Sequence, residues 1–319
     1  MKIAVLGYGV IGRGVVEICL TKKEIELVKI FDRKEKFDKQ LIDLFTDNID
    51  EILNDDSIEL IVEVLGGYDF AKRIAIDAIT HHKHFVTANK EVVAKDIDEL
   101  SFLARQNCVA FCYEASVGGT IPIIKNLKAL TLVNEITKIT GILNGTTNYI
   151  LSRMKENFSF EDALLDAKQK GFAESNPTFD LEGFDMMRKI AILSDLAWNT
   201  KIDIKQIKHV PVTEVKKYNL KKISKEKKTL KYICEATKID QEIHLSVQLV
   251  ALENDDLLSH INDEYNAVII ETKPADKFVF VGKGAGSLPT AAAIVGDIYD
   301  ILHQRVLDVY YNKNLYKIQ

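Results

Sequence analysis

The chain has 319 residues, 47% hydrophobic and 28% charged, which is typical of a globular protein with one or two domains. Its formal net charge of −5 argues against nucleic acid as a partner, because the phosphate backbone attracts basic surfaces. No apolar run approaches the ~20 residues of a membrane span, and the four scattered cysteines lack metal or redox spacing. We therefore expect a soluble, cytoplasmic protein that does not bind membranes.

A strand followed at once by a glycine turn opens the chain. Residues 2–6 form an apolar run, and a Gly-x-Gly-x-x-Gly motif then precedes an amphipathic helix. The glycines allow a tight turn, close approach of the backbone to a pyrophosphate, and close packing of helix on strand. Free N–H groups at the helix start suit the phosphates of a dinucleotide. The expected cofactor contacts at this turn are Gly7, Gly9, Val10, Ile11 and Gly12.

The second expected strand, residues 25–31, ends at Asp32, twenty residues after the motif. An acidic side chain there suits the ribose 2′-OH of NAD and repels the 2′-phosphate of NADP. Arg33 and Lys34 follow, and a cation at this place favours the 2′-phosphate instead. A solvated turn is the other interpretation of these two residues. The two readings of the cofactor conflict, and we expect NAD, or use of both cofactors.

The alternation of strands and helices predicts an α/β fold, with an N-terminal Rossmann domain and its doubly wound parallel sheet over residues 1–125. Residues 35–56 are charged and weakly periodic, and we expect a helix there that covers one sheet edge. A buried strand over residues 58–65 ends at Gly66, where a small residue lets the cofactor approach. Further strands are expected over residues 84–88 and 109–113, and helices over 68–81 and 97–107.

A second, α+β domain for catalysis and dimerisation is expected over residues 126–300. Residues 229–252 and 265–281 alternate apolar and polar positions, as antiparallel strands do. A half-exposed sheet often pairs with another subunit, so we expect a homodimer. The eight lysines of residues 216–231 are interpreted as a solvated face. The expected helices of this domain begin at Tyr149 and span residues 160–168 and 183–198.

A second glycine turn, with Gly284 and Gly286, precedes the last expected helix. Backbone N–H groups at a helix start again suit an anionic cofactor, so both glycines are candidate cofactor contacts.

The most informative stretch, residues 141–193, places four ionisable groups within sixteen positions: Glu174, Asp180, Asp185 and Lys189. The last two are i, i+4 neighbours on one face of an expected helix, and the others lie on the loop that leads into it. The plain alternative is a surface ion pair worth ~0.3–0.5 kcal/mol. The polar Asn-Gly-Thr-Thr-Asn block at residues 144–148 argues instead for a site, because shaped loops on rigid elements carry many functional groups.

This stretch resembles the signature of the homoserine dehydrogenase family: Gly-Ile-Leu-Asn-Gly-Thr-Thr-Asn from Gly141, then a Gly-Phe-Ala-Glu segment that runs to Lys189. The resemblance covers nearly the whole chain, with one departure at Asn176, where an Asp often precedes the proline. It implies NAD(P)-dependent interconversion of L-homoserine and L-aspartate 4-semialdehyde, in the threonine, methionine and isoleucine branch of aspartate-derived biosynthesis. Many members carry an ACT regulatory domain or a kinase, and we expect neither here. The resemblance also implies that residues 287–319 return toward the nucleotide domain.

The resemblance implies a role for each ionisable group. Hydride transfer to an aldehyde needs a proton donor at the oxygen, and a lysine serves as that donor, or as the base in reverse. We expect Lys189 to transfer this proton and Lys90 to support substrate and cofactor. Glu174 and Asp185 are expected to bind the amino-acid substrate, and Asp180 to orient Lys189.

The resemblance further implies a monovalent cation in the glycine-rich loop after residue 113. Its ligands by position are the Glu114 side chain and the carbonyls of Val117, Gly119 and Ile121. Oxygen ligands with little charge suit Na⁺ rather than a transition metal. The alternative is a plain interdomain turn.

Two other functions stay open from the residues. A different amino-acid dehydrogenase of the same two-domain plan would carry another signature in place of residues 141–189. A regulatory protein that senses NAD(H) without turnover would have lost the lysines and carboxylates, and all of these are present.

Overall fold

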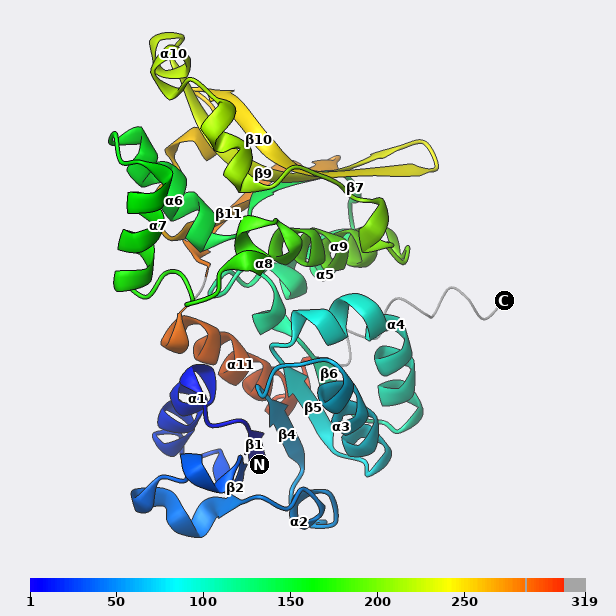
Figure 1. The fold of residues 1–319 in the computed structure, drawn as a ribbon. Coiled ribbons are helices and arrows are strands. Elements are labelled where there is room, and N and C mark those ends of the chain that lie inside the picture. The colour runs from blue at the N-terminus through cyan, green and yellow to red at the C-terminus, as the bar shows by residue number, and fades with distance from the viewer. Residues whose placement is uncertain (285, 307–319) are drawn as a thin grey trace. The chain divides into compact units, whose positions relative to one another are not determined.

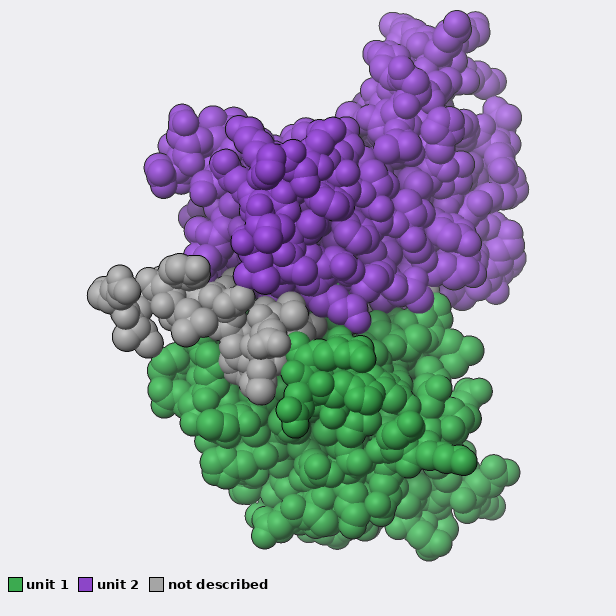
Figure 2. Space-filling model, turned by 180° about the vertical axis from the view of Figure 1, so that it is seen from behind, with its two compact units in different colours: residues 1–116, 286–319 green, residues 117–285 purple. Residues whose placement is uncertain are grey.

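The computed structural model describes residues 1–284 and 286–306, which form helices and strands in the order of Figure 1. The chain divides into two compact units, shown in separate colours in Figure 2. The first holds residues 1–116 and the described part of residues 286–319, and the second holds residues 117–285. No helix of the described ranges is long and apolar enough to cross a membrane.

A six-stranded parallel sheet forms the centre of the first unit, in the order β3-β2-β1-β4-β5-β6. This strand order is that of a Rossmann fold, so the predicted fold class is confirmed. Strands β1 and β4 are almost wholly buried, as expected for parallel strands covered by helices on both faces. The strands are β1 (Lys2–Leu6), β2 (Glu26–Phe31), β3 (Phe45–Thr46), β4 (Leu60–Glu63), β5 (His84–Thr87) and β6 (Phe111–Cys112). The helices are α1 (Val10–Leu20), α2 (Asp50–Leu53), α3 (Asp69–Thr80), α4 (Lys90–Gln106) and α11 (Ser287–Leu302).

The helix predicted over residues 35–56 is wrong. Two 3₁₀ turns (Lys34–Lys36 and Lys39–Leu44), edge strand β3 and the single turn of α2 occupy this segment. Side chains that bond the nearby backbone compete with a helix here, as Asp38 does by accepting from the Gln40 N–H at 2.9 Å. The rings of Phe37 and Phe45 stack with centroids 4.6 Å apart, which holds this segment against the sheet edge instead.

Helix α11 packs on α1 within the first unit (Figure 1). A Cβ added to Gly14 of α1 would lie 2.9 Å from Ser287 Oγ and 3.1 Å from Ala291 Cβ, so a glycine is needed for this close approach. Ser287 Oγ also donates to the Val10 carbonyl at 2.6 Å. Residues 307–319 of the predicted C-terminal segment lie outside the described residues.

A mixed six-stranded sheet forms the second unit, in the order β12-β11-β7-β9-β10-β8. Its pairs are antiparallel except β10 with β8, which confirms the predicted α+β domain. Helices cover one face of this sheet (Figure 1), where α9 packs on β7, β9 and β10. The strands are β7 (Glu135–Ile142), β8 (Lys208–His209), β9 (Lys228–Ile239), β10 (Glu242–Glu253), β11 (Tyr265–Lys273) and β12 (Asp276–Lys283). The helices are α5 (Ile123–Thr131), α6 (Gly145–Lys155), α7 (Phe160–Gln169), α8 (Thr178–Leu181), α9 (Phe184–Trp198) and α10 (Leu220–Lys225).

One member of the eight-lysine stretch is buried, contrary to the predicted solvated face. Lys231 lies on β9 with 1% of its surface exposed. Its ammonium donates to Asn148 Oδ1 at 3.3 Å, to Asn262 Oδ1 at 3.1 Å and to the Ile261 carbonyl. Three oxygen acceptors therefore replace the water that this lysine loses on folding.

Candidate active site

The polar block at residues 144–148 forms the first turn of α6 rather than a loop before it. Asn144 is the N-cap, and its Oδ1 accepts from the Thr147 N–H at 2.8 Å. The predicted helix start at Tyr149 is therefore too late. An asparagine cap starts the helix and keeps its own NH₂ group for other partners.

Two carboxylates converge on that NH₂ group. Asn144 Nδ2 donates to Asp180 Oδ1 at 2.8 Å and to Asp185 Oδ2 at 2.9 Å. Asp180 lies on α8 and Asp185 in the first turn of α9, so three elements meet at one nitrogen. Thr146 of α6 adds a hydroxyl 3.0 Å from Asp180 Oδ2, and this hydroxyl also donates to the Phe172 carbonyl at 2.6 Å.

Lys189 completes the cluster one helical turn after Asp185. Its Nζ donates to Asp185 Oδ2 at 2.8 Å and to the Leu143 carbonyl at 2.7 Å. The two residues are 7% and 4% exposed, so the surface ion pair considered as an alternative is excluded. Burying such a pair costs free energy unless its remaining hydrogen bonds are made. Here the Leu143 carbonyl accepts from Lys189, and the Asn144 amide donates to Asp185.

A glycine fixes the start of α9. Gly183 has φ +83°, and a Cβ there would lie 2.3 Å from Tyr232 Oη. Both the left-handed backbone and the close tyrosine exclude a side chain. Gly183 thus lets α9 follow α8 directly, with Asp180 and Asp185 on the two sides of the turn.

The cluster perturbs the titration of Asp180. Burial raises the pKa of its carboxyl, and the negative charge of Asp185 raises the pKa further. The hydrogen bond from Asn144 and the positive charge of Lys189 act in the opposite direction without cancelling this rise.

The glycine turn of the first unit is shaped to receive phosphates. Gly7 has φ +107°, and a Cβ on Gly12 would lie 1.8 Å from the Gly7 carbonyl oxygen, so neither position tolerates a side chain. A Cβ on Gly9 would meet no described atom within 4 Å, which leaves open space above the turn. Gly9 is the N-cap of α1 and supplies no side-chain cap, so the first N–H groups of the helix, which include those of Val10 and Ile11, are suited to an anionic ligand. These residues fit the pyrophosphate of a dinucleotide.

Asp32 follows β2 and is 3% exposed. Its Oδ2 accepts from the Tyr8 N–H at 2.7 Å and from Lys36 Nζ at 3.1 Å, and its Oδ1 accepts from the Arg33 N–H at 2.8 Å. Burial acts to raise the pKa of this carboxyl, but the three donors outweigh it and the pKa lies below its usual value. The contact with Lys36 was not predicted from the sequence.

Both parts of the chain are similar to known proteins. A family described as "Homoserine dehydrogenase" matches residues 122–299, and "Homoserine dehydrogenase, NAD binding domain" matches residues 7–114. The homoserine dehydrogenase of Bacillus subtilis is 34% identical over 97% of this chain and 74% of its own length. That of Synechocystis is 35% identical over 95% of this chain and 73% of its own length. The crystal structure of a homoserine dehydrogenase from Thiobacillus denitrificans has a TM-score of 0.90 at 30% identity, covering 98% of this chain and 75% of that one.

The chain belongs to the homoserine dehydrogenase family. It is an oxidoreductase that interconverts L-homoserine and L-aspartate 4-semialdehyde with a nicotinamide cofactor, within amino-acid biosynthesis. The function predicted from the family signature is confirmed, and its substrate is a small molecule.

The loop after β4, which contains Gly66, is held by a buried carboxylate. Glu63, at the end of β4, is fully buried and accepts from the Leu65 and Gly66 N–H groups at 2.8 and 3.2 Å. Its other oxygen accepts from Thr87 Oγ1 at 2.6 Å, and burial raises the pKa of this carboxyl. Glu63 therefore ties the loop after β4 to the end of β5, a role that the sequence analysis missed.

Lys90 is the first residue of α4, which begins earlier than the predicted helix over residues 97–107. The reason is the N-cap Asn89, whose Oδ1 accepts from the Glu91 and Val92 N–H groups at 3.2 and 3.3 Å. Asn89 Nδ2 also donates to the Gly67 carbonyl at 2.6 Å. These bonds place Lys90 beside the loop after β4 in the first unit.

Three other predicted site residues have no described hydrogen bond that supports their predicted roles. Glu174 is exposed, and no described hydrogen bond links it to the Asp180–Asp185–Lys189 cluster. Gly284 belongs to the second unit, where a Cβ would lie 2.1 Å from the Asn266 side chain, so packing explains this glycine. Gly286 has φ +126° and is the N-cap of α11 in the first unit. The roles of all three stay predictions.

The predicted cation ligands are divided between the units: Glu114 lies in the first, and Val117, Gly119 and Ile121 lie in the second. Glu114 is buried, and its N–H donates to Asp297 Oδ2 at 2.9 Å. Within residues 1–284 and 286–306, no group of three or more His, Cys, Asp or Glu side chains is arranged to hold a metal. A site built from backbone carbonyls stays a prediction.

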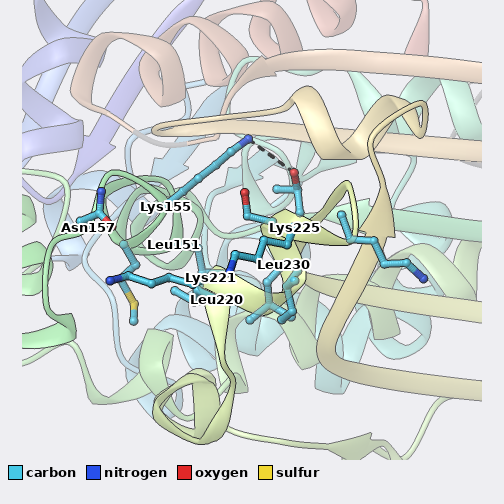
Figure 3. A pocket seen from close by; sticks show the side chains of 12 residues that line it. Leu151, Lys155, Asn157, Leu220, Lys221, Lys225 and Leu230 are labelled. Atoms are coloured by element: carbon cyan, nitrogen blue, oxygen red, sulfur yellow. Dashed lines mark hydrogen bonds between the residues drawn. The ribbon is translucent and has the colours of Figure 1, made fainter.

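A cavity of about 370 Å³ opens elsewhere in the second unit, between the end of α6, α10 and the start of β9 (Figure 3). Apolar side chains form part of its wall, and its lysines are Lys155, Lys221, Lys225 and Lys228. The lining includes none of the predicted site residues. This cavity therefore does not mark the active site.

Proposed function

We propose that Lys189 transfers the proton in the interconversion of L-homoserine and L-aspartate 4-semialdehyde. A nicotinamide cofactor, when bound, would supply the chemistry of hydride transfer to and from the carbinol carbon. The alcohol proton passes to the Lys189 amine during oxidation, and the Lys189 ammonium returns it to the aldehyde oxygen during reduction. The observation that supports this role is the position of the Lys189 side chain, which is buried. Two oxygen acceptors, Asp185 Oδ2 and the Leu143 carbonyl, fix the direction of its ammonium group.

The neighbouring carboxylates are assigned to the amino-acid part of the substrate. Asp185 and Glu174 bind its ammonium group, and Lys90 supports substrate and cofactor. Asp180 acts on Lys189 indirectly, because the described hydrogen bonds connect it through Asn144 to Asp185, which in turn pairs with Lys189.

The variant Lys189→Met tests the assignment. Methionine keeps much of the side-chain volume and cannot carry a proton, so homoserine-dependent reduction of the cofactor should be lost. Binding of NADH, followed by fluorescence, should match the wild type because the nucleotide residues of the first unit are unchanged. Turnover that persists in the variant would refute the role.

For the cofactor, we propose NAD with acceptance of NADP. The buried Asp32 carboxylate favours the ribose hydroxyls, and Lys36 offsets part of its charge at 3.1 Å. Gly7, Gly9, Val10, Ile11 and Gly12 hold the pyrophosphate. Arg33, Gly66, Lys90, Gly284 and Gly286 complete the proposed contacts.

We propose a homodimer formed through the sheet face of the second unit that its helices leave uncovered. A cavity of about 370 Å³ opens there, and its lining combines apolar side chains such as Ile233, Val250 and Leu257 with charged ones such as Lys138 and Glu235. Leu257 is 54% exposed. Apolar side chains on an uncovered sheet face are typical of subunit contacts.

Two further proposals rest on the family alone. Na⁺ binds to the Glu114 carboxylate and the carbonyls of Val117, Gly119 and Ile121, and the enzyme works in the cytoplasm with its soluble substrates.

A further inference from the structure

Tyr8 is held firmly inside the glycine turn of the first unit, where it is 6% exposed. Its ring meets the Phe45 ring edge-on, with centroids 5.0 Å apart. Its hydroxyl donates to Asp38 Oδ2 at 3.2 Å, and its backbone N–H donates to Asp32 Oδ2 at 2.7 Å. The Tyr8 ring is therefore a fixed platform between the glycine turn and the carboxylate that follows β2.

The Arg13 guanidinium lies over this platform. Arg13 is one helical turn after Gly9, to whose carbonyl its N–H donates at 3.0 Å. Its Cζ is 5.0 Å from the centroid of the Tyr8 ring, and its Nε donates to the Tyr8 carbonyl at 3.4 Å. The side chain thus turns back toward the glycine turn. A guanidinium on an aromatic face keeps its terminal N–H groups available for other partners.

The charge of Arg13 is not neutralised by an acidic side chain. Among the residues that the structure describes, no carboxylate forms an ion pair with Arg13. Asp38 also lies at the Tyr8 ring, where it accepts from the tyrosine hydroxyl, and Asp32 is paired with Lys36 at 3.1 Å. An exposed guanidinium near the start of a helix, without an acidic partner, favours an anionic ligand.

The position of Tyr8 indicates which anion this is. A dinucleotide on such a turn places its pyrophosphate at the first N–H groups of the helix and its adenosine ribose at the acidic residue after the second strand. Tyr8 joins these two places, because its backbone belongs to the turn and its N–H binds Asp32. A cation over the Tyr8 ring is thus on the adenosine side of the pyrophosphate, where NADP carries its 2′-phosphate.

We propose that Arg13 binds the 2′-phosphate of NADP and is a specificity-determining residue of the cofactor site. Two N–H groups of its planar fork donate to two phosphate oxygens, while Lys36 offsets the charge of Asp32. The inference rests on the proposed acceptance of NADP beside NAD. The sequence favoured Arg33 for this phosphate because that residue directly follows Asp32, whereas only the contact with Tyr8 reveals Arg13.

Two nucleotides that differ only in the 2′-phosphate test the assignment without turnover. Titration calorimetry of the whole enzyme with 2′,5′-ADP and with 5′-AMP measures both affinities. Arg13→Gln should weaken 2′,5′-ADP by about tenfold and leave 5′-AMP within about twofold of wild type. Equal losses for both nucleotides would assign Arg13 to the phosphate that they share and overturn the inference. Unchanged affinity for 2′,5′-ADP would overturn it as well.

Two further variants separate a direct contact from a general effect of charge. Lys22→Gln removes the same charge just after the other end of α1 and should leave both affinities unchanged. A loss of 2′,5′-ADP binding equal to that of Arg13→Gln would show a long-range charge effect and contradict the contact. Arg13→Lys keeps the charge without the planar fork, so its affinity for 2′,5′-ADP should lie between those of wild type and Arg13→Gln.

Kinetics should agree with the binding data. For Arg13→Gln, kcat/KM with NADP should fall about tenfold through a higher KM, while kcat/KM with NAD stays within about twofold of wild type. If the wild type binds neither nucleotide, the proposed cofactor fails together with this inference. If both nucleotides bind as expected but homoserine is not oxidised, the inference stands and the proposed catalytic role of Lys189 fails.

Discussion

A single contact of Asp32 changes the cofactor preference that we expect from the sequence. The sequence placed an acidic residue at the position that favours NAD, with cations just after it. The structure adds Lys36, four residues later, on the same carboxylate oxygen that accepts from the Tyr8 N–H. The carboxylate therefore repels a 2′-phosphate less strongly than an isolated one would, because part of its charge is offset.

Replacing Asp32 should move the enzyme toward NADP. Asp32→Asn removes the negative charge near the 2′ position, and kcat/KM for NADP relative to NAD should rise by about tenfold, equivalent to ~1.4 kcal/mol. Steady-state kinetics with both cofactors measures this ratio. Asp47→Asn, which removes an exposed partner of Lys34, is the matched control and should leave the ratio unchanged.

Lys231 should make the stability depend on alkaline pH. Burial lowers its pKa to about 8, and the charge of Lys155 contributes in the same direction. An unfolded lysine titrates near 10.4, so between about pH 8 and pH 10 the unfolded chain binds more protons than the folded one. The free energy of unfolding should therefore rise with pH in this range by an amount that Lys231→Met lacks. Urea denaturation of both proteins at several pH values measures the difference, and parallel curves would count against it.

At the residue scale, the sequence identified the ionisable groups and the neighbouring pair Asp185 and Lys189, but not the polar partners that join them to Asp180. Asp180, Asp185 and Lys189 were recognised because they lie close together along the chain in a familiar pattern. Asn144 is 36 residues from Asp180, and no local pattern reveals a contact over that separation. In the sequence, Asn144 stands out only as part of a polar block, residues 144–148, that is too hydrophilic for the stretch around it.

At the scale of elements, the errors are mostly at helix starts. Helices α4 and α6 both begin earlier than predicted, because Asn89 and Asn144 cap them. In both cases polar residues near a strand end were read as loop or strand, although asparagine is a strong N-cap. The long strands and the glycine turn were correct, because their burial pattern and backbone demands are local.

The turn between α8 and α9 offers a test of an element boundary. Gly183→Ala must adopt φ +83° and displace Tyr232 Oη, so we expect a loss of about 1–3 kcal/mol in the free energy of unfolding. Gly296→Ala is the matched control: it lies within α11, where a Cβ meets no described atom within 4 Å. That substitution should be neutral or stabilising by up to ~1 kcal/mol. Urea denaturation compares them, and equal stabilities would contradict the expected strain.

At the scale of the whole molecule, composition and strand alternation, read together with the N-terminal glycine motif and the family resemblance, predicted a Rossmann unit followed by an α+β unit. They do not show how the chain is divided, and only the family resemblance led us to expect that residues 287–319 return toward the nucleotide domain. Helix α11 belongs to the first unit, a pairing of the two ends of the described chain that depends on contacts such as Gly14 with Ala291. Such contacts join positions far apart in sequence, so no local pattern contains them.

The proposed homodimer makes a prediction at this scale. Leu257→Glu places a charge in the 3₁₀ turn Leu257–His260, beside the uncovered sheet face, and the protein should sediment as a monomer because burying an unpaired carboxylate is costly. Leu165→Glu, on α7, is the control with a similar exposure of 56% against 54%, and it should remain a dimer. Analytical ultracentrifugation distinguishes the two. A dimer in both variants would place the interface elsewhere.

Chemical rescue is the most direct measurement of the proposed role of Lys189. Lys189→Ala should have almost no homoserine-dependent reduction of the cofactor, and added primary alkylamines should restore part of it by occupying the space of the lost side chain. Because the amine would act as the base, the restored rate should depend on the pKa of the amine. A restored rate that follows amine pKa is the expected result. Full activity of Lys189→Ala without any amine would show that another group transfers the proton.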